Sequence, residues 1–158
     1  MRINIINVKE LTDQHLTAEY REIKMLPLAL VKSIKSKKGL DLKETPREFT
    51  LNTGHGKFFY NKIKFIENRF EQILVEMRER GFKTDCDKLY QDKDDYSAMM
   101  LFGKVSPRFY GDYTPTEVGI KISKERIKER ILTKELTKPK FYKYYGKNIC
   151  DVPSVNFY

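Results

Sequence analysis

Apolar side chains recur at helical spacing between Gly56 and Arg80, and this pattern constrains the fold more than any other feature of the sequence. They follow one another at intervals of three and four residues, which places them on one face of an α-helix. These residues are Phe59, Ile63, Ile66, Phe70, Ile73, Leu74 and Met77. Arg78 suits the negative end of a helix, and Gly81 suits the position that ends it. The sequence predicts a helix from about Gly56 to Arg80.

A second helix is predicted from about Asp13 to Ser36, where apolar residues again follow the helical period. Pro27 lies inside this segment. Because proline lacks an amide hydrogen and its ring crowds the preceding turn, we expect a kink or a break there.

A third helix is predicted to open at Thr114 and to continue to about Thr133. Thr114 suits the N-cap, Pro115 the first helical position, and Glu117 completes a capping box. No segment shows sustained alternation of apolar and polar residues, so we expect little sheet. With 158 residues, close to the size of one domain, the chain is expected to form a single all-α domain spanning residues 1–158.

The charge predicts a polyanionic partner. Lysine and arginine number 31 against 22 aspartates and glutamates, which gives a net charge of +9. Lysines and aromatic residues interleave between Lys138 and Lys147, a pattern that suits opened nucleic acid; alternatively, the aromatics pack on the core and the lysines face water.

The stretch from Phe82 to Tyr113 lacks periodicity, and its aspartates should face away from DNA phosphates. These are Asp85, Asp87, Asp92, Asp94 and Asp95.

The sequence also predicts the compartment. It holds no apolar run long enough to span a membrane, and its amino terminus does not look like a signal peptide. Cys86 and Cys150 lie far apart and form no metal-binding spacing, which fits a reducing cytosol. We therefore expect a cytoplasmic protein that has no membrane partner.

Two candidate sites remain open at this point. His15, Glu19 and Glu22 share one face of the predicted first helix, and they suit a solvated stripe, a divalent metal site or a carboxylate pair for acid–base chemistry. His55 stands in a glycine-flanked turn before a helix. Such a turn can hold an anion, or the histidine can be satisfied locally as part of a cap.

Six motifs occur in the order found in one known family. They are RIN at residues 2–4, DQHL at 13–16, AEYRE at 18–22, GH at 54–55 with FFY at 58–60, GDY at 111–113 with Pro115, and YKYYGK at 142–147. In these motifs the chain resembles the pyrimidine-dimer DNA glycosylase and abasic-site lyase family, of the bacteriophage T4 endonuclease V type. The resemblance covers nearly the whole chain.

The resemblance implies a compact domain of three main helices with long loops and with the amino-terminal segment threaded between the helices. It implies a glycosylase that releases the 5′ pyrimidine of a cyclobutane dimer and then cuts the strand at the abasic site by β-elimination. The nucleophile would be the α-amine of Met1, assisted by the carboxylate of Glu22. The implied DNA-binding residues are Arg2, Gln14, His15, Arg21, Arg126, Arg130, Phe141, Tyr142 and Lys143.

The resemblance implies no cofactor and no metal; the expected partner is double-stranded DNA that contains pyrimidine dimers or abasic sites. We expect a monomer that acts near the nucleoid of a bacterial or phage-infected cell. The sequence departs from the family pattern where Met1 stands in place of a threonine, where Met25 replaces an arginine, and where Phe141 replaces a tryptophan. Two other functions stay open: a metal-dependent nuclease that uses His15, Glu19 and Glu22, and a DNA-binding protein without activity.

Overall fold

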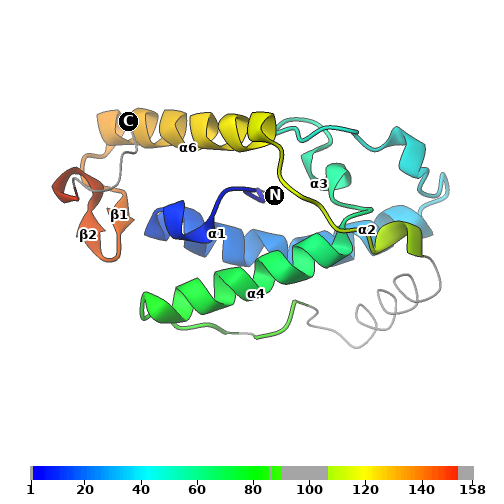
Figure 1. Cartoon of the computed structure of the whole chain (residues 1–158), viewed down its shortest axis with the longest axis horizontal. Coiled ribbons are helices and arrows are strands. Elements are labelled where there is room, and N and C mark those ends of the chain that lie inside the picture. Colours follow the sequence, from blue (N-terminus) through cyan, green and yellow to red (C-terminus); the bar gives the residue numbers. More distant parts are fainter. Residues whose placement is uncertain (1, 86, 90–106, 153–158) are drawn as a thin grey trace.

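The computed structural model describes residues 2–85, 87–89 and 107–152, and it confirms the all-α class (Figure 1). A two-stranded antiparallel hairpin follows the last helix. In chain order the elements are η1 (Val8–Glu10), α1 (Asp13–Ile23), α2 (Met25–Lys35), η2 (Leu42–Glu44), α3 (His55–Phe58), α4 (Ile63–Glu79), η3 (Pro107–Phe109), α6 (Glu117–Thr137), β1 (Lys143–Tyr144), β2 (Lys147–Asn148) and η4 (Ile149–Asp151).

The predicted first helix is divided into α1 and α2, which meet at Lys24. The cause is Pro27, as the sequence predicts. An amide hydrogen at position 27 would bond to the carbonyl of Ile23, four residues earlier, and proline has none. The regular helix therefore ends at Ile23 and resumes at Met25.

The predicted second helix begins later than expected, since α4 starts at Ile63 and the short helix α3 precedes it. The break has a tertiary cause: Lys62 forms a bridge with Tyr110, and the carbonyl of Asn61 accepts a hydrogen bond from the amide of Gly111 at 3.1 Å. Backbone engaged with a distant segment cannot also continue the helix.

The carboxyl end of α4 agrees with the prediction. Gly81 has a φ of 74°, in the left-handed region that glycine tolerates. Its amide donates to the carbonyl of Arg78 at 2.9 Å, and the amide of Phe82 donates to the carbonyl of Met77 at 2.9 Å. This pair of bonds is a Schellman motif, which satisfies the last carbonyls of the helix.

The predicted start of the third helix is wrong by two residues. Thr116, not Thr114, is the N-cap of α6, and its hydroxyl accepts a hydrogen bond from the amide of Gly119 at 3.1 Å. The capping box expected with Glu117 is therefore absent, because Glu117 is the first helical residue. The helix continues to Thr137, four residues beyond the predicted end.

The amino-terminal segment lies between helices, as the resemblance implies. Figure 1 shows it between α1 and α6, above α4. Its apolar side chains belong to the core, together with those of α1 and α4 that pack against each other. The buried residues of the segment are Ile3, Ile5, Ile6, Val8 and Leu11. This burial fixes the course of the chain near its first residues.

Two of the predicted aspartates lie within the described residues. Asp85 accepts a hydrogen bond from the hydroxyl of Tyr20 and pairs with Lys24, and Asp87 pairs with Arg78 at 2.8 Å. Asp92, Asp94 and Asp95 lie outside the described residues, so their predicted orientation is untested. None of the described helices is both long enough and apolar enough to cross a bilayer.

Candidate active site and nucleic-acid interface

Arg2 and Glu22 meet at the amino-terminal end of the chain. Glu22 lies on the last turn of α1, and its Oε1 is 3.8 Å from Nε of Arg2. The Glu22 side chain is 23% exposed and that of Arg2 is 52% exposed. The pair is therefore partly exposed, although Oε2 of Glu22 is buried. Met1, the predicted source of the nucleophile, lies outside the described residues.

Two arginines of α6 face the same place. Arg126 and Arg130 are one turn apart, and they line a small cavity of about 40 Å³ together with Arg2 and His15. Burial, and then the charges of Arg2 and Arg126, lower the pKa of Arg130. Nε of Arg130 is buried without a hydrogen-bond partner within the described structure. Three positive charges held this close favour the binding of an anion.

His15 is buried beneath these arginines. Its ring stacks on that of Tyr142, with centroids 4.9 Å apart and planes within 6°. Burial, and then the charges of Arg130 and Arg2, lower the pKa of His15 to about 4, so the ring is neutral at physiological pH. Its Nδ1 lies 2.7 Å from Oγ1 of Thr12, and its buried Nε2 has no partner among the described residues.

Gln14 attaches the carboxy-terminal aromatic segment to α1. Its amide nitrogen donates to the carbonyl of Phe141 at 2.9 Å, and its amide oxygen accepts from the backbone nitrogen of Lys143 at 2.8 Å. Tyr142 is therefore held against His15, while the Lys143 side chain remains exposed. Gln14 thus has a structural task that the sequence did not reveal.

Phe141, Arg21 and Met25 lie near the surface. Nζ of Lys134 is 5.1 Å from the ring centroid of Phe141, and Nζ of Lys138 is 5.5 Å from it. Arg21 is exposed beside Glu22, and Met25 is 57% exposed one turn further on. The aromatic segment thus combines both sequence-based alternatives: Tyr142 is buried, and Phe141 is partly accessible among lysines.

Glu19 lines the cavity together with His15, whereas Glu22 does not, and the carboxylate of Glu19 is held by other residues. It pairs with Arg69 of α4 at 2.9 Å and accepts a hydrogen bond from the side chain of Asn4 at 2.7 Å. The described residues contain no group of three histidines, cysteines or carboxylates that could hold a metal ion. The sequence did contain a signal for this pair, since Arg69 interrupts the apolar face of α4 and a buried arginine needs a buried carboxylate.

His55 is satisfied structurally by hydrogen bonds within the fold, but it is not part of a local cap. Its Nδ1 lies 2.5 Å from the carbonyl of Thr50, and its Nε2 accepts a hydrogen bond from the backbone nitrogen of Ile3 at 2.9 Å. The sequence did not predict the contact with Ile3, because no pattern in it relates residue 55 to residue 3.

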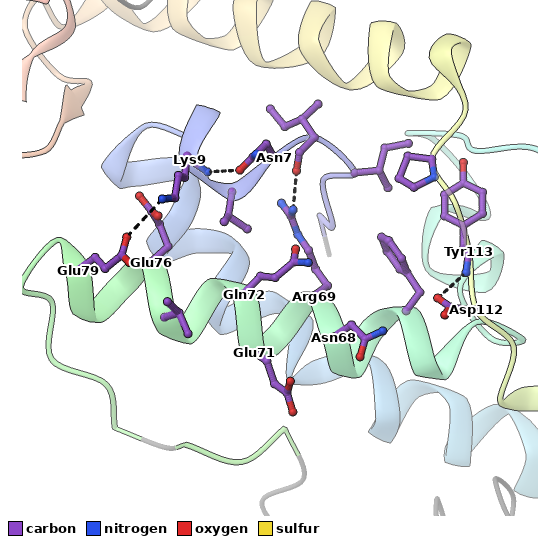
Figure 2. A pocket seen from close by; sticks show the side chains of 16 residues that line it. Asn7, Lys9, Asn68, Arg69, Glu71, Gln72, Glu76, Glu79, Asp112 and Tyr113 are labelled. Atoms are coloured by element: carbon purple, nitrogen blue, oxygen red, sulfur yellow. Dashed lines mark hydrogen bonds and ion pairs between the residues drawn. The ribbon is translucent and has the colours of Figure 1, made fainter.

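A larger groove of about 880 Å³ lies between residues 5–9, α4 and residues 112–115 (Figure 2). Its polar residues are largely paired with one another: Lys9 with Glu79 at 3.9 Å, and the carboxylate of Asp112 with the amide of Tyr113 at 2.9 Å. The basic cavity, not this groove, brings together four of the predicted site residues: Arg2, His15, Arg126 and Arg130.

The family described as pyrimidine dimer DNA glycosylase matches residues 1–90, which is more than half of the chain. The matched part contains the amino-terminal segment, α1 and α4, and with them Arg2, His15 and Glu22.

Proposed function

Because the chain belongs to the pyrimidine dimer DNA glycosylase family, we propose that it releases the 5′ pyrimidine of cyclobutane dimers and then cuts the abasic strand by β-elimination. Family membership makes it a DNA repair glycosylase whose substrate is DNA. The lyase step, the Schiff-base intermediate and the residue roles below are parts of the proposal.

One observation carries this proposal: the carboxylate of Glu22 pairs with Arg2, the residue next to Met1, and Arg2 lines a cavity together with Arg126 and Arg130. A damaged strand needs phosphate contacts to bind, and Arg126 and Arg130 supply the positive charge for them. The reaction also needs a nucleophile and a negative group near a sugar that becomes positively charged. The proposed nucleophile and Glu22 fulfil these needs.

The nucleophile is the neutral α-amine of Met1. An α-amine has a reference pKa of about 7.7–8.0, so a useful fraction is unprotonated at physiological pH. The adjacent positive charge of Arg2 disfavours the ammonium form. The amine attacks C1′ of the sugar, and the glycosidic bond breaks with its electron pair leaving on the base. Loss of the amine proton and opening of the sugar then give an iminium linkage.

Glu22 acts on the charge that develops. Its carboxylate stabilises the cationic sugar and the iminium, and it removes a proton from C2′ in the second step. The electron pair of that C–H bond forms a double bond, and the 3′ phosphate leaves, which cuts the strand. Arg21 and Lys143 bind the backbone phosphates further from C1′.

Aromatic and polar groups complete the proposed interface. Phe141 offers a partly exposed ring on which a base can stack, and the ring of Tyr142 stacks on that of His15. His15 lines the arginine-lined cavity, and its Nε2 is buried without a partner among the described residues. Gln14 keeps this segment in place. We propose that the whole chain acts as one cytoplasmic, monomeric domain near the nucleoid.

Borohydride trapping tests the proposal. Incubation with a duplex that contains a dimer or an abasic site, in the presence of borohydride, should reduce the iminium to a stable covalent adduct. Peptide mass spectrometry should place the adduct on the Met1 amine. An adduct confined to an internal lysine would refute the assignment of the nucleophile, and the absence of any adduct or strand cut would leave a binding protein only.

The same reaction in EDTA should be unchanged, whereas its loss, with recovery on adding magnesium or manganese, would favour a metal-dependent nuclease.

A further inference from the structure

Side chains from two helices hold the backbone of residues 3 and 4. The amide of Ile3 donates to Nε2 of His55, on α3, at 2.9 Å. The amide of Asn4 donates to Oε1 of Glu19, on α1, at 3.1 Å, and its side-chain nitrogen donates to Oε2 at 2.7 Å. Buried backbone groups need partners, and in a sheet a neighbouring strand supplies them. Here the side chains of His55 and Glu19 supply these hydrogen-bond partners.

Glu19 is itself fixed from a third helix. Nε and NH2 of Arg69, on α4, lie 2.9 Å and 3.2 Å from its two carboxylate oxygens. NH1 of Arg69 donates to the carbonyl of Ile6 at 2.5 Å, and Figure 2 shows this side chain rising from α4 to the amino-terminal segment. The side chains of Arg69 and Glu19 are 3% and 0% exposed. Such a buried pair adds little net stability compared with apolar packing. Its two hydrogen bonds do, however, fix the orientation of the Glu19 carboxylate.

His55 is suited to act as an acceptor. The carbonyl of Thr50 can only accept a hydrogen bond, so Nδ1 of His55 carries the hydrogen and Nε2 is left with a lone pair for Ile3. Burial lowers the pKa of His55, which favours this neutral form. The ring is thus held in one tautomer, aimed at residue 3.

The amino-terminal segment and α1 run side by side in opposite directions. Asn4 meets Glu19, and Arg2 meets Glu22 one helical turn later. Along the amino-terminal segment, residues 2 and 4 are about 6.6 Å apart if the backbone is extended. Along α1, residues 19 and 22 are about 4.5 Å apart, which is a comparable length. Holding Asn4 on Glu19 therefore brings residue 2 to Glu22.

We propose that Glu19, Arg69 and His55 are positioning residues, which fix the first residues of the chain so that the α-amine meets the substrate sugar beside Glu22. This inference rests on the proposed function, because it needs the amine to be the nucleophile. A nucleophile on a chain terminus is useful only if the terminus is held, since a misplacement of about 1 Å can reduce a rate about a hundredfold.

Asn4→Ala tests the inference with little risk to folding. It removes the 2.7 Å bond to Glu19 but leaves the pair of Glu19 with Arg69. At saturating abasic-site duplex, the rate of borohydride-trapped adduct formation should fall about tenfold or more. The dissociation constant for a duplex with an uncleavable abasic analogue should stay at the parent value. Asn7→Ala is the matched control, because its side chain bonds only to the amide of Lys9 among the described contacts and should leave the trapping rate unchanged.

Glu19→Gln should lower the trapping rate further, provided that it folds. A parent-like trapping rate in Asn4→Ala would overturn the inference, and so would a loss of rate matched by an equal loss of affinity. If the parent protein itself forms no adduct, the proposed function fails first. If the parent is trapped on Met1 and Asn4→Ala is trapped equally fast, only the positioning role fails.

Discussion

At the scale of single residues, two carboxylates on the same helix differ in burial and in partners. Glu19 and Glu22 are three residues apart on α1, yet one is buried against Arg69 and the other reaches the surface beside Arg2. The buried carboxylate is already committed to two partners. In the proposed reaction, the partly exposed one responds to the charge that develops on the substrate.

Glu22→Gln should separate chemistry from binding. The substitution keeps the shape of the side chain but removes the negative charge that stabilises the cationic sugar, so the single-turnover rate should fall about 10²–10³-fold, or roughly 2.7–4 kcal/mol. Affinity for dimer-containing duplex should be retained, since it depends on arginines. Quenched-flow assays and gel-shift titrations measure the two quantities. Glu71→Gln, an exposed carboxylate of α4, is the control, and a parent rate in Glu22→Gln would remove Glu22 from the active site.

His15 should make the fold acid-sensitive. Its pKa is lowered from 6.5 to about 4, so between these values the unfolded chain binds more protons than the folded one. Its contribution to stability is therefore present above about pH 6.5 and is lost as the pH falls towards 4, up to roughly 3 kcal/mol. Urea unfolding across this range should show the loss. His15→Gln should show a shallower pH dependence, with a remainder due to His55, whose pKa is also lowered by burial; an unchanged slope would contradict this account.

At the scale of elements, the carboxy-terminal hairpin depends on one aspartate. The hairpin turn contains Tyr145 and Gly146, with φ of 49° and 77°. Oδ1 of Asp13 accepts from the amide of Tyr145 at 3.1 Å, and Oδ2 accepts from that of Gly146 at 2.8 Å. Arg80 binds the same carboxylate at 3.0 Å. Asp13, at the start of α1, thus connects the hairpin to α4.

Asp13→Asn should loosen this hairpin. An amide group has only one acceptor oxygen, so its NH₂ would face either a backbone amide or the guanidinium of Arg80. The free energy of unfolding should fall by about 1–3 kcal/mol, and the amides of Tyr145 and Gly146 should exchange with solvent faster. Asp112→Asn is the matched control: its pair with Lys64 is half exposed, so the substitution should cost less than about 1 kcal/mol. Unchanged exchange at Gly146 in Asp13→Asn would contradict the assigned role.

The sequence predicts local features of these elements well and tertiary ones poorly. Pro27 and Gly81 mark helix boundaries because their effects are confined to the neighbouring turns. The start of α4 could not be predicted, since the bridge between Lys62 and Tyr110 joins segments far apart in the chain. At α6, two threonines two residues apart offer equally good caps, and local pattern does not choose between them.

The candidate site shows the same difference between local features, which the sequence predicts, and tertiary ones, which it does not. The resemblance implied that Arg2, His15 and Glu22 belong to one site. The structure brings Arg2 and His15 to one cavity with Arg126 and Arg130, and Glu22 pairs with Arg2. The role of Glu19 was misjudged because helical periodicity places it on the face of His15 and Glu22. Only the packing of α4 against α1 reveals its partner, Arg69.

At the scale of the whole molecule, part of the excess positive charge lies around the arginine-lined cavity. The amino-terminal segment, α6 and the carboxy-terminal aromatic segment together carry Arg2, Arg126, Arg130 and Lys143. Lys64 of α4 is paired with Asp112, and Arg2 and Arg126 are paired with Glu22 and Glu129. In the proposed function, the basic residues around the cavity bind phosphates and release their counterions.

The salt dependence of DNA binding should report this surface residue by residue. Each phosphate contact adds about 0.9 to the slope of the logarithm of the binding constant against the logarithm of salt concentration. Arg126→Ala should therefore weaken binding to dimer-containing duplex and reduce the slope by about one, while the single-turnover rate at saturation changes less. Lys64→Ala is a suitable control because the two side chains are similarly exposed, 42% and 51%, and each is paired with a carboxylate. If both variants change the slope equally, binding depends on total charge and not on the arginine cavity, and the interface proposed here would have to extend over α4 as well.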